Sequence, residues 1–90
     1  MRRPVYSGQC KRDVKRVEKR GKDMAKFKAL ARLLIAADPL PIPYRDYPLK
    51  GARASFRDAH IEPDWRLIYK VDGEALRFER TGTHADLFDE

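Results

Sequence analysis

The chain has one cysteine among 90 residues and no apolar run long enough to cross a membrane. A single cysteine, Cys10, cannot form an internal disulfide, so nothing in the sequence requires an oxidising compartment. A membrane-spanning helix needs roughly 18 consecutive apolar residues. Residues 1–9 also lack the apolar stretch of a secretory signal peptide. We therefore expect a cytoplasmic protein that has no membrane partner.

Histidine is scarce as well, and the two histidines, His60 and His84, are 24 positions apart. Neither H-x-x-x-H spacing nor paired cysteines occur, so the chain carries no zinc signature, and we expect neither a metal nor a cofactor. Internal repeats and low-complexity tracts are absent too. A chain of this length has material for one core, so residues 1–90 are expected to form a single domain with its function on the surface or in a shallow cleft.

Positive charge is abundant and unevenly placed. Residues 1–32 carry 12 Lys and Arg against 3 Asp and Glu, whereas residues 33–90 carry 8 against 11. The sequence pI is about 9.7. Cations concentrated in one segment of a basic domain favour a partner of repeated negative charge, usually a nucleic acid. An acidic protein partner would satisfy the same electrostatics.

The first third of the chain has the pattern of two helices. Cys10, Val14 and Val17 follow the spacing of one helical stripe and are surrounded by basic residues, which predicts an amphipathic basic helix. Gly21 suits its C-terminal end, and Asp23 suits the N-cap of a second helix. That helix has Met24, Phe27, Leu30, Ala31 and Leu34 on one face, and it should end at the Asp38-Pro39 pair.

The rest of the chain predicts a loop and then strands. Residues 39–48 hold four of the six prolines and are expected to form an extended crossing loop. Alternating patterns over residues 56–61, 65–71 and 76–81 predict three strands joined by tight turns, and residues 4–7 a further edge strand. We expect an α+β fold in which a helical hairpin packs on a small antiparallel sheet.

Three titratable side chains should meet at one end of that sheet. His60 ends the first strand of the meander, Asp64 opens the second, and His84 follows the third. These positions share one rim, and strand spacings place them within roughly 10 Å of each other. Two imidazoles with pKa values of about 6.5 can supply an acid and a base, and a carboxylate can orient one of them. Neighbouring cations, Arg57, Arg66, Arg77 and Arg80, could face a phosphate.

Each of these residues also has a purely structural explanation. Histidines at strand ends are often only exposed or structural, Asp64 also suits a turn, and Trp65 and Phe88 also suit core packing. The basic helix also suits a solvated face, and Cys10 suits buried packing within its stripe.

Two longer stretches resemble a known family. "RDAHIEPDWRLIYK" at 57–70 and "LRFERTGTHADLF" at 76–88 resemble the YafQ branch of the RelE toxin superfamily, and "YSGQ", "KDM" and "YPLKG" support this. The resemblance implies a RelE-like microbial ribonuclease fold and a ribosome-dependent endoribonuclease that cuts messenger RNA in the A site of the 70S ribosome without metal. It also implies a cognate antitoxin of the DinJ or RelB type.

The resemblance assigns roles to residues of this chain. His60 and His84 would share acid and base duties, Asp64 would act as base or orient an imidazole, and Arg80 or a nearby cation would hold the phosphate. Trp65, Phe88 and Lys50 would bind the nucleotide. Contacts to ribosomal RNA phosphates would come from the basic segment: Lys11, Arg12, Lys15, Arg16, Lys19, Arg20 and Lys22.

One position departs from the family pattern. Tyr47 stands before "PLKG", where the family usually has a histidine. A phenol with a pKa of about 10 is a poor base unless cations such as Arg45 or Lys50 lower that pKa, although it can still donate a proton. Tyr47 therefore either takes over catalysis or weakens it. The alternative function is a module that binds RNA, the ribosome or an antitoxin without cutting.

Overall fold

The amphipathic segments of the first third form two helices in the computed structural model, which describes residues 1–88. They are α1 (Gly8–Lys19) and α2 (Met24–Ala36). Asp23 caps α2 as predicted, because its side chain accepts the Ala25 N–H at 3.0 Å. Gly21 adopts a φ of +82° just after α1, so the chain reverses there without steric strain. The helical hairpin is therefore confirmed.

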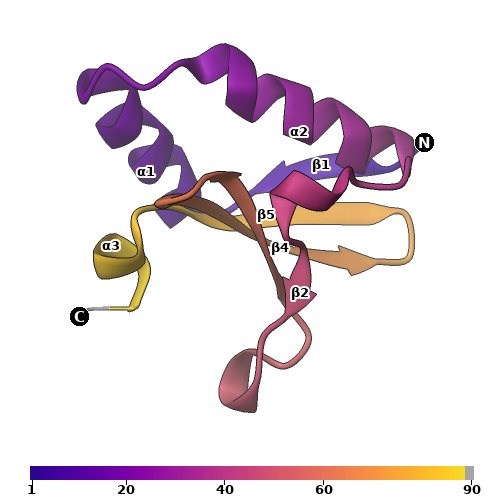
Figure 1. The fold of residues 1–90 in the computed structure, drawn as a ribbon. Coiled ribbons are helices and arrows are strands. Elements are labelled where there is room, and N and C mark those ends of the chain that lie inside the picture. The colour runs from indigo at the N-terminus through magenta and orange to yellow at the C-terminus, as the bar shows by residue number, and fades with distance from the viewer. Residues whose placement is uncertain (89–90) are drawn as a thin grey trace.

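Five strands form one sheet in the order β1-β5-β4-β3-β2 (Figure 1). Their bounds are β1 (Arg3–Tyr6), β2 (Tyr47–Pro48), β3 (Arg57–Glu62), β4 (Trp65–Asp72) and β5 (Ala75–Gly82). The meander β3-β4-β5 is antiparallel as expected. The predicted N-terminal strand, β1, runs parallel to β5 at the opposite edge from β2, which makes the whole sheet mixed.

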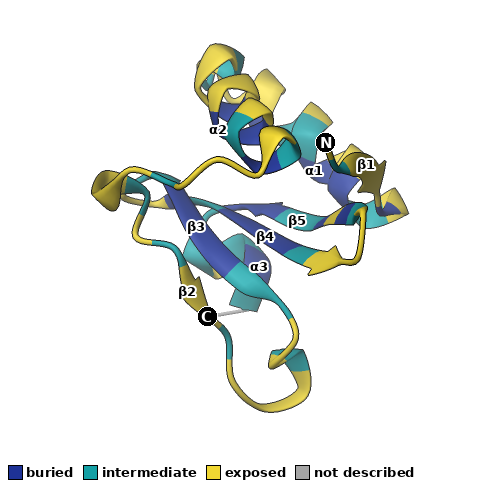
Figure 2. Cartoon of the chain, turned by 90° about the vertical axis from the view of Figure 1, so that its right-hand side faces the viewer, coloured by how far each residue is buried: buried dark blue, intermediate teal, exposed yellow. Residues whose placement is uncertain are grey.

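The core lies between the helical hairpin and one face of the sheet. α2 contributes Phe27, Leu30 and Leu34, which pack with Leu67 and Phe78 of the sheet. Figure 1 shows both long helices on the same side of the strands, and Figure 2 shows buried residues on the helix faces that meet the sheet. Burial of such side chains stabilises the fold by roughly 1.5–3 kcal/mol each. The other face of β3 and β4 is therefore free to carry polar groups.

The proline-rich segment is more ordered than predicted. It contains a 3₁₀ turn, η1 (Ile42–Tyr44), and then β2, which pairs with β3 through Tyr47 opposite Asp58 and Pro48 opposite Arg57. Proline lacks an N–H, so it is tolerated on an edge strand such as β2. A second 3₁₀ turn, η2 (Gly51–Arg53), follows on the loop that projects from the sheet.

A short helix, α3 (His84–Phe88), follows β5 and was not predicted. Its first turn is a capping box: the Thr83 side chain accepts the Asp86 N–H at 3.1 Å, and Asp86 accepts the Thr83 N–H at 3.0 Å. Asp86 also comes so close to Gly82 that a Cβ there would lie 2.9 Å from its carboxylate. The pattern T-x-x-D after a glycine was the signal that could have revealed this helix.

Within residues 1–88, no helix combines the length and the apolar composition that a membrane crossing needs.

Candidate active site

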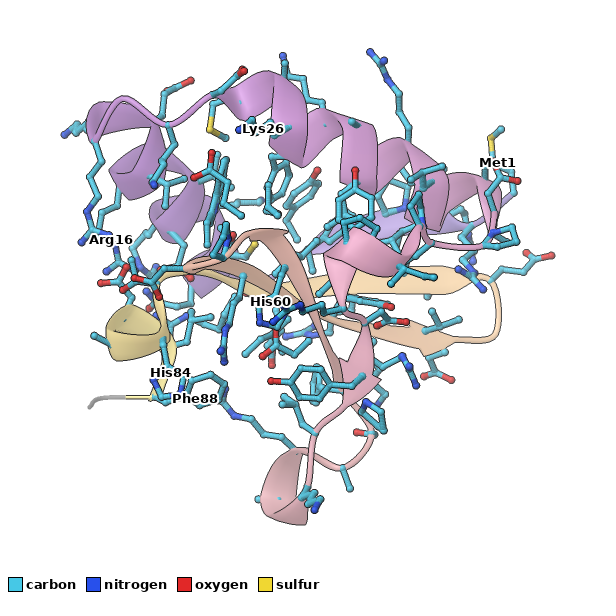
Figure 3. The ribbon with its side chains drawn as sticks, in the orientation of Figure 1. Met1, Arg16, Lys26, His60, His84 and Phe88 are labelled. Atoms are coloured by element: carbon cyan, nitrogen blue, oxygen red, sulfur yellow. The ribbon has the colours of Figure 1, made fainter. Side chains whose placement is uncertain are left out.

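His60 lies on the face of the sheet away from the helices. Its neighbour Ala59 belongs to the core, and side chains alternate along a strand, so His60 and Asp58 share the opposite face. Arg66 lies directly opposite His60 on β4 and therefore joins them. Figure 3 shows His60 near the middle of the molecule, below the long helices, with His84 and Phe88 to its lower left on α3.

Asp58 is the carboxylate at the centre of this face. It is fully buried, and one of its oxygens, Oδ2, accepts hydrogen bonds from the Tyr47 hydroxyl and from Arg66 Nη1, both at 3.3 Å. Burial raises the pKa of Asp58, and the positive charges of Arg66, His60 and His84 oppose that rise. The pKa of this one buried carboxylate thus depends on a guanidinium and on both imidazoles.

Tyr47 is held as a donor beside His60. Its ring centroid is 5.9 Å from that of His60, and its hydroxyl points to Asp58. Burial and the neighbouring Asp58 carboxylate raise the pKa of Tyr47, and the Arg66 charge opposes them only in part. The sequence left open whether cations would bring the pKa of Tyr47 below its ordinary value; its net shift is upward. The phenol stays protonated at neutral pH and can donate a hydrogen bond or a proton.

Asp46 fixes the loop that carries Tyr47. It accepts the Tyr69 hydroxyl at 2.6 Å and Arg57 Nε at 3.0 Å, both from the meander. These bonds bind the proline-rich segment to β3 and β4 immediately before β2 begins. The position of Tyr47 opposite Asp58 follows from this anchor.

The second imidazole, His84, lies at the start of α3. Asp64 Oδ1 accepts the His84 backbone N–H at 3.3 Å, and the His84 ring lies 4.8 Å from that of Phe88. The structure thus brings His60, Asp64 and His84 to the same end of the sheet. Asp64 contacts the backbone of His84, which suits orientation of that residue.

Phe88 is flanked by two guanidinium groups. The Arg53 and Arg66 guanidinium carbons lie 5.8 Å and 6.0 Å from the centroid of its ring. Arg53 belongs to η2 and Arg66 to β4, so two separate segments place positive charge beside one half-buried aromatic ring. Such an arrangement suits a nucleotide, which offers both a base to stack and a phosphate to neutralise.

Several buried polar atoms on this face have no hydrogen-bond partner among the described residues. They are His60 Nδ1, Asp58 Oδ1, Arg66 Nε and Arg53 Nη1. Buried polar groups are normally paired, and unpaired ones cluster where a ligand or water binds. The candidate active site is therefore the face formed by Tyr47, Arg53, Asp58, His60, Arg66, His84 and Phe88, which is called the catalytic face below.

Two predicted roles do not agree with the positions of their side chains. Arg80 Nε donates to Asp13 on α1 at 2.7 Å, and its Nη2 also bonds the Asp86 carbonyl, so its bonds lead away from the catalytic face. Arg66 occupies the place expected for Arg80. Trp65 is only 1% exposed and donates its indole N–H to Thr81 at 3.0 Å. It packs in the core and presents no free face to a base.

The remaining predicted residues lie on the surface or near it. Lys50 is exposed on the loop after β2. Four basic side chains of α1 and the C-cap residue Arg20 line a shallow groove: Arg12, Lys15, Arg16, Lys19 and Arg20. Arg20 and Arg16 also ion-pair with Asp86, at 2.6 Å and 3.8 Å. Lys22 pairs with Glu62 at 3.0 Å, so part of this charge is already neutralised.

Comparison with known proteins identifies the family. Residues 2–89 match the family described as "Bacterial toxin of type II toxin-antitoxin system, YafQ". The chain belongs to this family. It is 60% identical over 84 residues to the mRNA interferase toxin YafQ of Escherichia coli K12, covering 92% of this chain and 91% of that protein.

Solved structures of YafQ have the same fold. YafQ from E. coli BL21(DE3) superposes with a TM-score of 0.93 at 55% identity, covering 98% of this chain and 99% of the other. YafQ in the E. coli DinJ–YafQ complex gives a TM-score of 0.91 at 56% identity, over the same shares of the two chains. The resemblance and the α+β fold predicted from the sequence are therefore confirmed.

Three residues of the catalytic face of this YafQ-family protein were missed or only partly recognised from sequence. Asp58 was seen only as part of the β3 alternation, although its i, i+2 spacing from His60 was a usable signal. Arg66 was noted as one cation among four. Arg53 carried no signal, because its proximity to Phe88 depends on how the projecting loop folds back. Within residues 1–88, no group of three or more His, Cys, Asp or Glu side chains is arranged to hold a metal ion.

Proposed function

We propose that this toxin cleaves translated messenger RNA at the ribosome by acid–base catalysis without a metal, and that a cognate antitoxin neutralises it. The enzyme class, an endoribonuclease, is that of the mRNA interferase toxins to which it is 60% identical. The observation that carries the mechanism is the placement of two imidazoles, a protonated phenol and a guanidinium around the buried Asp58.

In the proposed reaction, the RNA 2′-oxygen attacks the adjacent phosphorus. A base takes the proton from the 2′-hydroxyl, the O2′–P bond forms, the P–O5′ bond breaks, and an acid gives its proton to the leaving O5′. The products are a 2′,3′-cyclic phosphate and a 5′-hydroxyl. His60 and His84 share the base and acid duties, because a neutral imidazole can accept a proton and an imidazolium can donate one.

Arg66 takes the phosphate-holding role that was expected for Arg80 or a nearby cation. Its Nε has no partner among the described residues, and its ion pair with Asp58 keeps the guanidinium at the catalytic face. A fixed positive charge close to the reacting phosphate stabilises the charge that builds up on the phosphate oxygens. Tyr47 donates a second hydrogen bond to the phosphate or leaving oxygen, Phe88 stacks on a base, and Asp64 fixes His84.

The partner proposal rests on the E. coli DinJ–YafQ complex, in which a relative is bound to DinJ. A DinJ-like antitoxin encoded beside this toxin would bind it and relieve its toxicity. The ribosomal proposal rests on the exposed cations of α1, which suit RNA phosphates.

The test uses purified toxin, ribosomes and a translated message, with primer extension to locate cuts. Wild type should cut the message, whereas His84→Ala and Arg66→Ala should cut at least about 100-fold more slowly. Arg32→Ala, an exposed cation on α2, is the matched control and should keep wild-type activity. A wild-type protein that stalls translation and leaves the message whole would mean that the toxin binds without cutting.

A further inference from the structure

A cleft opens beside the catalytic face and has been given no role so far. It has a volume of about 620 Å³ and lies between the η1 turn and the β3–β4 hairpin. Its lining residues are Ile42, Pro43, Arg45, His60, Ile61, Glu62, Pro63 and Arg66. Two of them, His60 and Arg66, also belong to the catalytic face. The cleft and the reacting groups are therefore continuous.

The walls of the cleft are mainly apolar, and cationic side chains also line it. Ile42 is 90% exposed at the mouth, with Pro43 beside it, and Ile61 and Pro63 form the opposite side. Arg45 and Arg66 supply positive charge, and the single carboxylate, Glu62, is paired with Lys22 and Lys26 at 3.0 Å and 2.9 Å. Apolar walls next to cations suit a nucleobase joined to its phosphate.

The strand edge that borders the cleft is also open. β2 covers β3 only at Arg57 and Asp58, so among residues 1–88 no strand pairs with the outer edge of β3 from Ala59 to Glu62. The backbone N–H and C=O groups along such a strand edge can form hydrogen bonds with the polar atoms of a nucleobase. They could equally pair with a peptide strand. The shared His60 and Arg66 favour RNA, because a substrate that reaches them must run past this cleft.

We propose that this cleft binds one nucleobase of the RNA substrate, next to the scissile phosphate and on the side away from Phe88. The proposal rests on the ribonuclease function above and deepens it. His60 and Arg66 separate the cleft from the Phe88 ring, so the reacting phosphate lies between two bases, one on Phe88 and one in the cleft. The cleft residues other than His60 and Arg66 are then specificity residues: they select the nucleotide next to the cut and do not take part in proton transfer.

Binding of RNA pentamers that cannot be cut tests the cleft without depending on catalysis. Each pentamer carries 2′-O-methyl groups, and a series has one abasic nucleotide at each position in turn. Wild-type affinity, measured by fluorescence anisotropy, should fall roughly tenfold when the base at the cleft position is removed. Ile42→Ser and Arg45→Asn should bind the complete pentamer as weakly as wild type binds the pentamer that lacks this base. Their affinity should not change further when the base is removed.

These variants are chosen to keep the fold. Ile42 is almost fully exposed, so its replacement removes no core packing. Arg45 has a φ of +45°, which asparagine tolerates better than most residues. Val5→Ser, an exposed apolar position on β1 at the other edge of the sheet, is the matched control and should behave as wild type.

A cleavage experiment separates this inference from the proposed function. On translated messages, Ile42→Ser should still cut but with a changed distribution of cut sites. If wild type cuts nothing, the ribonuclease function fails. In another outcome, wild type cuts the message while the variants show the same affinities as wild type across the abasic series and the same cut sites. That result would overturn only the cleft proposal. Loss of antitoxin binding in the variants with unchanged RNA discrimination would also overturn it and assign the cleft to a protein strand.

Discussion

Tyr47 and Asp58 together determine which groups on the catalytic face can act as acids. Asp58 accepts from the phenol and from Arg66, and burial raises the pKa values of both Asp58 and Tyr47. The phenol is therefore a donor throughout the neutral range, which is why our proposal assigns the base duty to the imidazoles. A tyrosine at position 47 thus fits acid chemistry and does not fit base chemistry.

Tyr47→Phe tests the donor role. The variant removes one hydroxyl from a side chain that is 41% exposed, so its thermal midpoint should stay within a few degrees of wild type. We expect kcat for RNA cleavage to fall about 100-fold with little change in KM, because the hydrogen bond matters most in the transition state. The pH values at which kcat rises and falls should not move. A shifted pH profile would contradict a phenol that stays protonated.

Asp58→Asn tests the buried carboxylate. An acid whose folded pKa is raised contributes stability below its unfolded pKa of about 3.9, and that contribution is lost as pH rises through the folded pKa. The free energy of unfolding of wild type relative to Asp58→Asn should therefore decrease between pH 4 and pH 7, measured by urea denaturation. Activity should fall at least tenfold, because Arg66 loses its anchor. An increase in relative stability over this pH range would refute the burial argument.

Among the elements, α3 decides where His84 and Phe88 lie. It has only five residues, so its position depends on tertiary contacts and its cap more than on helix propensity. Asp86 supplies both kinds of support: it closes the capping box with Thr83, and it binds Arg20, the C-cap residue of α1, at 2.6 Å. Through this ion pair, the C-terminal end of α1 holds α3 in place beside the catalytic face.

Asp86→Asn tests this support. The Arg20 side chain and the Thr83 N–H hold the pKa of Asp86 well below its usual range. A depressed pKa contributes stability above the unfolded value of about 3.9, and the contribution is lost as pH falls. The variant should lose about 1 kcal/mol at pH 7 and less at pH 3, measured by urea denaturation. Asp38→Asn, an exposed aspartate after α2, is the control. An equal loss at both pH values would contradict the charged clamp.

At the scale of the whole molecule, positive charge and catalytic groups occupy different regions. The exposed cations of α1 line one groove, whereas His60 lies on the sheet face away from the helices. In the proposed function, the net charge of +6 would assist docking to a large anionic partner, while a few fixed residues would carry out the chemistry.

Charge reversal on α1 tests this division of labour. Lys15→Glu with Lys19→Glu should weaken binding to ribosomes and reduce the slope of log affinity against log salt by roughly one unit for each phosphate that α1 no longer neutralises. Lys28→Glu on α2 is the control at matched exposure. Equal slopes for both proteins, in a sedimentation binding assay over a range of salt, would show that α1 does not face ribosomal RNA.

The amino-acid sequence alone determined the helical hairpin, the β3-β4-β5 meander and the common rim of His60, Asp64 and His84, because helical and strand periodicities and short turns act locally. Only the tertiary structure decided that Arg66 and not Arg80 lies beside Asp58 and Phe88, that Trp65 is buried, and that α3 and Arg53 reach the same face. These outcomes depend on which residues, distant in the sequence, each side chain contacts in the folded protein. Arg80 lies within reach of the buried Asp13, and Arg66 lies within reach of Asp58, and the attraction between opposite charges at low dielectric outweighs any local pattern.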